Sequence, residues 1–249
     1  MIELTNISKV FNRGKANEVT ALQPLDLQIA EGEFLTLIGA NGSGKTTLLN
    51  LIAGAVLPST GRIRIDGEDI TDLPEHRRAR WVARVFQNPL GGTAPDLSIL
   101  DNFRLAALRT RPKRLVIGID ERFKATVRDK IAALGLGLEN KLQQPIGALS
   151  GGQRQALTLL MSAMDHTDIL LLDEPTAALD PKSAEVVMQT AERIIGEYQL
   201  TTVLITHNLR DAHRFGNRLI QMSGGQVVRD LGAADKQRLQ VQEMYGWFG

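Results

Sequence analysis

The 249-residue sequence contains no cysteine, and this absence excludes both a disulfide framework and a metal site with thiolate ligands. Long hydrophobic runs are also missing, because purely apolar stretches such as Ile169–Leu172 fall far short of the ~20 residues that a membrane-spanning helix needs. Residues 1–4 have neither the basic start nor the apolar stretch of a secretory signal. We therefore expect a soluble chain that stays in the cytosol.

Charge of one sign is not in excess either. The sequence has 29 Lys and Arg against 28 Asp and Glu, so no global field attracts it to nucleic acid, and we expect no nucleic-acid partner. It also lacks internal repeats and low-complexity linkers. With 43% hydrophobic residues it can bury one sizeable core, so we expect a single domain over residues 1–249.

The hydrophobic pattern indicates alternating strands and helices. Apolar positions alternate with polar ones near Leu25–Ile29, which is typical of a half-buried antiparallel strand. Continuous apolar runs predict strands buried in a parallel sheet at Phe34–Ile38, Trp81–Phe86, Ile169–Leu172 and Val203–Ile205. Helical spacing between them predicts an α/β parallel sheet. The stretch from about 88 to 164 is mostly helical, and we expect it to form an inserted helical subdomain.

The segment GANGSGKT, which begins at Gly39, matches the phosphate-binding loop in full and stands between a predicted strand and a predicted helix. In such a loop, backbone N–H groups surround the phosphates, the lysine reaches the β- and γ-phosphates, and the threonine hydroxyl binds magnesium. The expected ATP-binding residues here are Gly39, Asn41, Gly42, Ser43, Gly44, Lys45, Thr46 and Thr47.

A second motif, ILLLDE, ends an apolar strand in two acids, Asp173 and Glu174. At the carboxyl end of a central strand, Asp173 would lie beside the phosphate loop and hold Mg²⁺ through water. We expect Glu174 to act on the attacking water. Taken alone, the pair could be an ordinary junction between strand and loop, but with a complete phosphate loop it predicts a nucleoside triphosphatase.

A third motif, LSGGQ, precedes an amphipathic run that predicts a helix capped by Ser150. The exposed N–H groups of such a helix start can bind an anion, and no strand precedes it, so we expect a phosphate delivered from elsewhere, which a partner subunit could supply. The residues expected there are Ser150, Gly151, Gly152 and Gln153. The sequence SGGQ occurs again at 223–226, where strand-like flanks predict a hairpin turn instead.

Along the chain the motifs come in the order phosphate loop, LSGGQ and ILLLDE, and in this order and near-family spacing they resemble the ABC ATPases over practically the whole chain. The resemblance implies a phosphate-loop NTPase (RecA-like) core, an antiparallel β subdomain and an inserted α-helical signature subdomain. It implies an ATPase that drives a membrane transporter as a homodimer. Its expected partners are ATP with Mg²⁺, transmembrane permease subunits and, through them, a solute-binding protein. Its expected place is peripheral, on the cytoplasmic face of the cell membrane.

The resemblance also assigns single residues. Phe11 would stack on adenine, Gln87 would sense magnesium and attacking water, and His207 would meet the γ-phosphate. Asp180 would belong to a loop between subunits, although a helix cap explains it equally well. The catalytic set is then Glu174, His207 and Gln87, with Thr46, Gln87 and Asp173 at the metal.

The direction of transport and the solute are less defined. The segments 86–102, 134–142 and 150–164 resemble importers of aromatic amino acids or related small solutes. The alternatives are an exporter with a separate permease and a soluble ABC ATPase without a membrane partner. A basic cluster, defined by Arg104, Arg109, Arg111, Lys113 and Arg114, is either a solvated face or a contact with permease loops or lipid headgroups.

Overall fold

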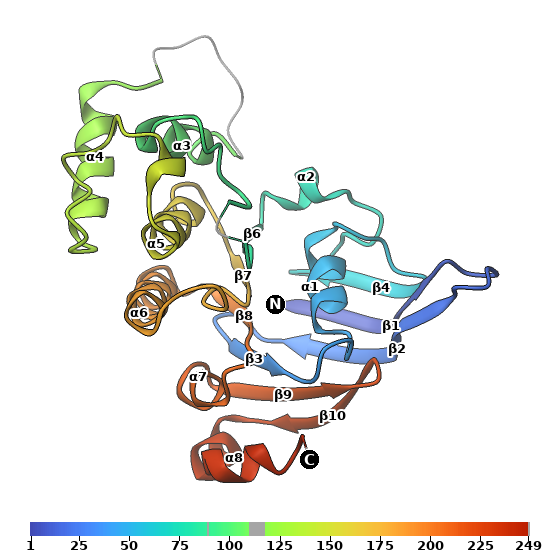
Figure 1. The fold of residues 1–249 in the computed structure, drawn as a ribbon. Coiled ribbons are helices and arrows are strands. Elements are labelled where there is room, and N and C mark those ends of the chain that lie inside the picture. The colour runs from blue at the N-terminus through green and yellow to red at the C-terminus, as the bar shows by residue number, and fades with distance from the viewer. Residues whose placement is uncertain (89, 110–117, 249) are drawn as a thin grey trace. The chain divides into compact units, whose positions relative to one another are not determined.

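The computed structural model describes residues 1–88, 90–109 and 118–248, and it divides the chain into two compact units (Figure 1). The first unit consists of Met1–Arg78, Leu171–Glu174 and the residues from Leu200 on. The second consists of Ala79–Leu170 and Pro175–Gln199. Within the described ranges, no helix is long and apolar enough to cross a membrane.

The first unit contains an antiparallel sheet in the order β2-β1-β4-β5. Its strands are β1 (Ile2–Phe11), β2 (Val19–Ile29), β4 (Thr60–Ile65) and β5 (Glu68–Asp69). Leu4 pairs with Leu27 across β1 and β2 and with Ile63 across β1 and β4, and all three side chains are buried. The antiparallel strand predicted near Leu25–Ile29 is confirmed, whereas β4 was not expected.

The same unit contains a mostly parallel sheet, ordered β10-β9-β3-β8-β7. Its strands are β3 (Phe34–Ile38), β7 (Ile169–Asp173), β8 (Thr201–Ile205), β9 (Arg218–Ser223) and β10 (Gln226–Leu231). Strand β3 runs parallel to both β8 and β9, and its side chains Leu35 and Leu37 are fully buried. The α/β fold class is confirmed, and so is the hairpin at the repeated SGGQ, since β9 and β10 pair as antiparallel strands.

The helices of this unit, in the part of the chain that the structure describes, are α1 (Lys45–Ala53), α2 (Glu75–Arg78), α7 (Leu209–Arg214), α8 (Ala233–Arg238) and α9 (Val241–Tyr245). Helix α1 contacts β2 and β8, one strand of each sheet. Its C-terminal end is held by Arg78, a fully buried side chain that donates to the carbonyls of Leu51 and Ile52. A cation at this end of a helix interacts favourably with the helix dipole.

The second unit is mainly helical, with β6 (Val82–Val85) and a short 3₁₀ turn, Ile146–Ala148. Its helices are α3 (Ile99–Ala106), α4 (Glu121–Ala132), α5 (Gly151–Ser162) and α6 (Pro181–Tyr198). Helix α5 contacts α3, α4 and α6. It is therefore the central helix of this unit, and its N-terminus is the LSGGQ segment.

Candidate functional site

The phosphate loop connects β3 to α1. Ile38 ends the strand in the core, Gly44 caps the helix, and Lys45 is the first helical residue. Asn41 and Thr46 are exposed at the surface of the loop, and Thr47 is half-buried. The arrangement leaves the N-terminus of α1 open to an anion, as the motif predicts.

Lys45 lies folded back over this loop, with only 5% of the residue exposed. Its ammonium donates to the carbonyl oxygens of Gly39 at 2.7 Å and Ala40 at 3.0 Å. Burial lowers the pKa of Lys45, and the carboxylates of Glu174 and Asp173 oppose that effect by favouring the charged form. The side chain is thus a buried cation at the base of a loop that can receive phosphate.

Two glycines let neighbouring backbone approach the loop closely. A Cβ atom on Gly39 would lie 2.3 Å from the carbonyl oxygen of Met222 on β9, and one on Gly44 would lie 2.7 Å from that of Ala21 on β2. The hairpin turn at Gly225 also donates its N–H to the carbonyl of Ser43. Backbone from both sheets of this unit therefore borders the loop. Glycine is needed at these positions for steric reasons as well as for phosphate binding.

Neighbouring strands bring two predicted catalytic residues together. Glu174 follows β7 and His207 follows β8, and His207 Nε2 lies 2.6 Å from Glu174 Oε1. The Glu174 side chain is 14% exposed, that of His207 43% exposed. Glu174 has a left-handed backbone (φ 48°), and its N–H donates to the carbonyl of Ile205 at 3.0 Å. This turn places a shielded carboxylate and an accessible imidazole in one hydrogen-bonded pair beside Lys45.

The oxygen groups near the loop suit a hard cation. Asp173 is nearly buried at the end of β7, and Thr46 offers a hydroxyl in the first turn of α1. The described residues contain no cluster of three or more histidine or acidic side chains that would hold a metal by itself. Mg²⁺ usually takes one or two protein oxygens and completes its shell with phosphates and water, so these donors fit it when a nucleotide is present.

Phe11 occupies a different sheet of the first unit. It ends β1, pairs with Val19 and is half-buried. The ammonium of Lys9 lies 5.0 Å from the centre of its ring, which places a cation over the aromatic face. The stacking role predicted for this residue stays a prediction.

In the second unit, the LSGGQ segment begins α5 as expected. The Ser150 hydroxyl accepts from the N–H of Gln153 at 3.3 Å, and the Gln153 side chain accepts from the N–H of Ser150 at 3.2 Å. This reciprocal capping box fixes the helix start. Gly152 packs against Ser183 of α6, because an added Cβ would lie 2.5 Å from Ser183 Cβ.

Asp180 caps the neighbouring helix α6. Its carboxylate accepts from the N–H groups of Lys182 and Ser183, each at 3.1 Å, and hydrogen bonds from Ser183 lower the pKa of Asp180. The capping role is therefore confirmed, and the role between subunits stays a prediction. Ser183 joins the two helix starts, and the sequence analysis did not single it out. Its position two residues after the Asp-Pro signal is the only local hint.

Gln87 is exposed in the bend after β6. The preceding residue, Phe86, accepts a 2.9 Å hydrogen bond from the side chain of Gln155, which is fully buried on α5. The structure thereby ties the Gln87 segment to the helix that begins at LSGGQ. Sequence reasoning missed Gln155, since a glutamine on an amphipathic helix carries no sign of burial.

The basic cluster divides into parts. Arg109 donates to the carbonyl of His166 at 2.9 Å and to the hydroxyl of Thr167, and burial lowers its pKa. The Arg104 guanidinium lies 5.6 Å from the centre of the Phe123 ring. Both arginines therefore make contacts within their own unit, so neither alternative, solvated face or docking surface, describes Arg109. Arg111, Lys113 and Arg114 lie outside the described residues.

Comparison with known proteins adds independent findings. The family model described as ABC transporter matches residues 22–177. The tyrosine transport ATP-binding protein of Clostridioides difficile (strain R20291) is 39% identical over 245 residues, which cover 98% of this chain and 97% of that protein. The lipoprotein-releasing system ATP-binding protein LolD 1 of Caulobacter vibrioides is 34% identical, covering 93% of this chain and 97% of that protein.

A solved structure also matches. The dimeric post-hydrolysis structure of the ATP-binding cassette MJ0796, bound to ADP and phosphate, superposes with a TM-score of 0.80 at 30% sequence identity. The match covers 94% of this chain and 99% of that one. Sequence and fold thus point to the same kind of protein over nearly the whole length.

Proposed function

The chain belongs to the ABC transporter family, and we propose that it is the subunit whose ATP hydrolysis drives uptake of a small organic solute, such as an amino acid, through separate permease subunits. It is an ATPase cassette with a phosphate-loop NTPase fold. One observation carries the proposal: the Glu174 carboxylate, 2.6 Å from His207 Nε2, lies close enough to the buried Lys45 to affect its pKa.

In this proposal Lys45 exchanges its carbonyl partners for phosphate. The ammonium that now donates to Gly39 and Ala40 would donate to the β- and γ-phosphates, and the N–H groups at the start of α1 would bind the remaining oxygens. Because the cation is already buried and oriented, little further ordering is needed.

Glu174 is the group that we assign to proton transfer. Its carboxylate is shielded from bulk water, and it can accept a proton from a water that attacks the γ-phosphate. In this proposal, the 2.6 Å contact from His207 Nε2 fixes the orientation of the carboxylate toward that water. Mg²⁺, when bound, would neutralise phosphate charge, with Thr46 and Asp173 to hold it. The metal and water contacts expected of Gln87 stay predictions.

We further propose that two copies of the chain act together. The capping box of Ser150 and Gln153 fixes the start of α5, and the N-terminal end of this helix favours an anion that we expect from outside the chain. A second copy would supply this anion as its bound ATP. The dimeric form of the similar MJ0796 cassette supports the pairing. We also infer that the two compact units form one cassette over residues 1–249.

The solute class rests on likeness. The relative that is 39% identical over nearly the whole chain is a tyrosine transport protein, which favours an aromatic or related amino acid. A solute-binding protein would deliver this solute to the permease, and this chain would lie on the cytoplasmic face of the membrane. The lipoprotein-releasing relative, 34% identical, favours the alternative of an exporter with a separate permease.

Reconstituted vesicles distinguish these functions. The chain is placed in liposomes together with its permease subunits, ATP is supplied only on the side of the chain, and labelled tyrosine is followed. We expect the solute to accumulate on the ATP side, and Glu174→Gln to stop the accumulation. Movement away from the ATP side supports export. If the chain hydrolyses ATP but no permease copurifies with it, transport is the wrong function.

A further inference from the structure

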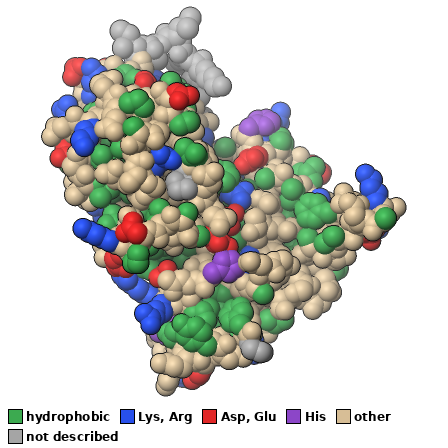
Figure 2. Space-filling view, viewed as in Figure 1, with side chains coloured by type: hydrophobic (Ala, Val, Ile, Leu, Met, Phe, Trp, Pro, Cys, Tyr) green, Lys and Arg blue, Asp and Glu red, His purple; other side chains and the backbone are tan. Residues whose placement is uncertain are grey.

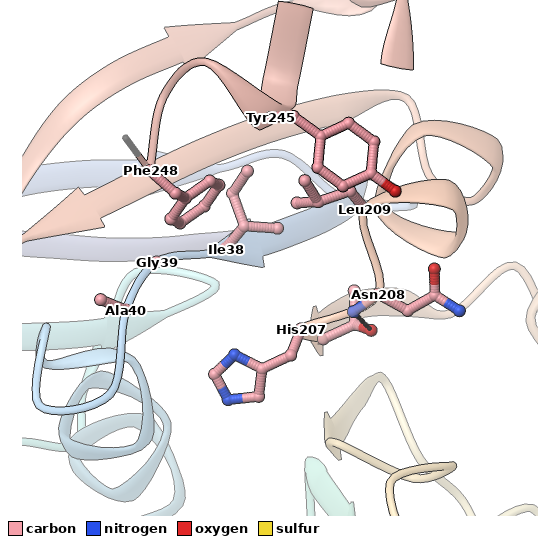
Figure 3. Close-up of a pocket in the computed structure, with 9 residues that line it drawn as sticks. Ile38, Gly39, Ala40, His207, Asn208, Leu209, Tyr245 and Phe248 are labelled. Atoms are coloured by element: carbon pink, nitrogen blue, oxygen red, sulfur yellow. Dashed lines mark hydrogen bonds between the residues drawn. The ribbon is translucent and has the colours of Figure 1, made fainter. Parts of the chain in front are cut away.

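A pocket of about 310 Å³ is lined by His207 of the predicted catalytic pair and by residues near the C-terminus. Residues 38–40 and 206–209 form two of its walls, and Tyr245 and Phe248 form the third (Figure 3). It thus joins the beginning of the phosphate loop, the His207 loop and the C-terminal segment. The function proposed above uses the first two and gives the third no role.

The C-terminal segment is rich in aromatic residues in a sequence that has few. Of two Trp, two Tyr and seven Phe, three lie between positions 245 and 248. Tyr245 is 58% exposed and Phe248 is 44% exposed, and Figure 2 shows hydrophobic side chains gathered on the surface over the C-terminal elements. Exposed apolar side chains that form one contiguous patch point to a binding site, whereas scattered single ones do not.

These rings are held by a fixed segment. Met244 is fully buried in a cluster with Ile38, Ala212 and Leu219, and Trp247 packs against the same cluster. The carbonyl of Trp247 also accepts from the Gln221 side chain at 3.2 Å. Met244 and Trp247 therefore anchor the segment, and Tyr245 and Phe248 line the pocket.

We propose that this pocket is a binding site for a small planar aromatic compound with a hydrogen-bonding group. The ring would lie against Tyr245 and Phe248, which favour stacked or edge-to-face contacts. Its polar group would meet the side of the pocket formed by His207 and Asn208. A volume of about 310 Å³ holds one ring system with a short substituent, because it lies at the lower end of the range for ligand pockets, and it is too small for a peptide segment.

An occupant of this pocket would touch residues that hold the catalytic groups. Gly39 and Ala40 accept from the Lys45 ammonium, and His207 holds Glu174. Occupancy should therefore change the rate of ATP turnover at saturating ATP. This second consequence rests on the proposed function, whereas the binding itself does not.

The test uses p-cresol as an aromatic probe and 4-methylcyclohexanol as a control of similar size without the ring. Saturation-transfer NMR on the full chain measures the binding of each. We expect saturable binding of p-cresol with Kd on the order of 1 mM, which is reasonable for a compound of this size. The double variant Tyr245→Ala/Phe248→Ala should weaken it at least about fivefold. Tyr198→Ala, which removes another exposed aromatic ring, should leave it unchanged.

The results divide cleanly. Equal binding of both probes, no saturable binding, or binding that survives the double variant would overturn the site. Association of two copies through Tyr245 and Phe248 without cresol binding, seen by sedimentation, would also overturn it in favour of a protein contact. If cresol binds as expected but turnover stays constant, the coupling to hydrolysis is wrong. If the chain has no ATPase activity at all, the NMR result still decides the site.

Discussion

Replacing Glu174 by glutamine should separate ATP hydrolysis from ATP binding. Glutamine keeps the size of the side chain and a hydrogen-bonding partner for His207, but it cannot take a proton from water. A general base typically contributes 10²–10⁴-fold in rate, which corresponds to about 2.7–5.5 kcal/mol of transition-state stabilisation. We expect the turnover rate of Glu174→Gln to be lower than that of the parent by a factor in this range. Affinity should stay the same or rise, because Glu174 is a negative charge near Lys45 and would repel the phosphates.

Lys45→Ala should fail differently. The variant removes a charge-assisted hydrogen bond to phosphate, worth about 1.5–3 kcal/mol, so affinity should drop by roughly 10–150-fold together with turnover. A fluorescent ATP analogue measures affinity and released phosphate measures turnover, both with magnesium present. The matched control for Glu174→Gln is Glu33→Gln, because the Glu33 side chain is 16% exposed, close to the 14% of Glu174, but forms an ion pair with Arg218 instead of His207.

Two results would refute the assignment. The first is a loss of affinity in Glu174→Gln as large as that in Lys45→Ala, and the second is turnover above about a tenth of the parent's. A double variant gives an internal check. Because His207 acts through the same 2.6 Å contact, Glu174→Gln/His207→Ala should be hardly slower than the slower single variant.

Three further predictions follow from single side chains. Ser150→Arg should abolish ATP hydrolysis, because the arginine fills the anion site at the start of α5. Ser223→Arg, in the second SGGQ at the β9–β10 hairpin, should keep most of the hydrolysis in the same phosphate-release assay. Equal loss in both variants would contradict the anion site at Ser150. Arg78→Leu should lower the free energy of unfolding in urea by about 3 kcal/mol or more, because buried carbonyls such as that of Leu51 lose their donor, while exposed Arg77→Leu should change it little. Burial lowers the pKa of Lys236 from 10.5 to about 8, so between pH 8 and 10.5 the unfolded chain binds more protons than the folded chain. The free energy of unfolding should therefore rise with pH over this interval, by up to about 3 kcal/mol. The variant Lys236→Met should remove that rise.

Local signals predicted much of this molecule. The glycine-rich loop after an apolar strand, the Asp-Pro helix start and the capping serine of LSGGQ each specify a turn or cap within a few residues, and all appear in the structure. The strand at Phe34–Ile38 has its predicted bounds, because a run buried on both faces is apolar throughout and ends where the chain must turn. Helix α4 ends at Ala132 and is capped by Ala133, so Leu134 lies beyond the helix although its apolar side chain continues the helical spacing of Val127 and Ile131.

Features that depend on distant contacts were not predictable. Strand β4 alternates over only four residues, from Arg62 to Ile65, and it is stabilised by pairing with β1, more than fifty residues earlier. The contact between Glu174 and His207 requires β7 and β8 to be neighbours, although the long helix α6 separates them in sequence. In the sequence Arg109 belongs to a run of basic residues that is typical of a solvated surface. Its partial burial depends on contacts with the backbone at His166, which lies far away in the sequence.

The close backbone contacts of the phosphate loop have a consequence for engineering. The Met222 carbonyl faces Gly39, and the Ala21 carbonyl faces Gly44, at distances that leave no room for a methyl group. A loop transplanted alone into another scaffold would lose these two walls and the hydrogen bond from Gly225 to Ser43. The smallest portable unit is therefore the loop together with the β9–β10 hairpin and the middle of β2, three segments that would have to be exchanged as one.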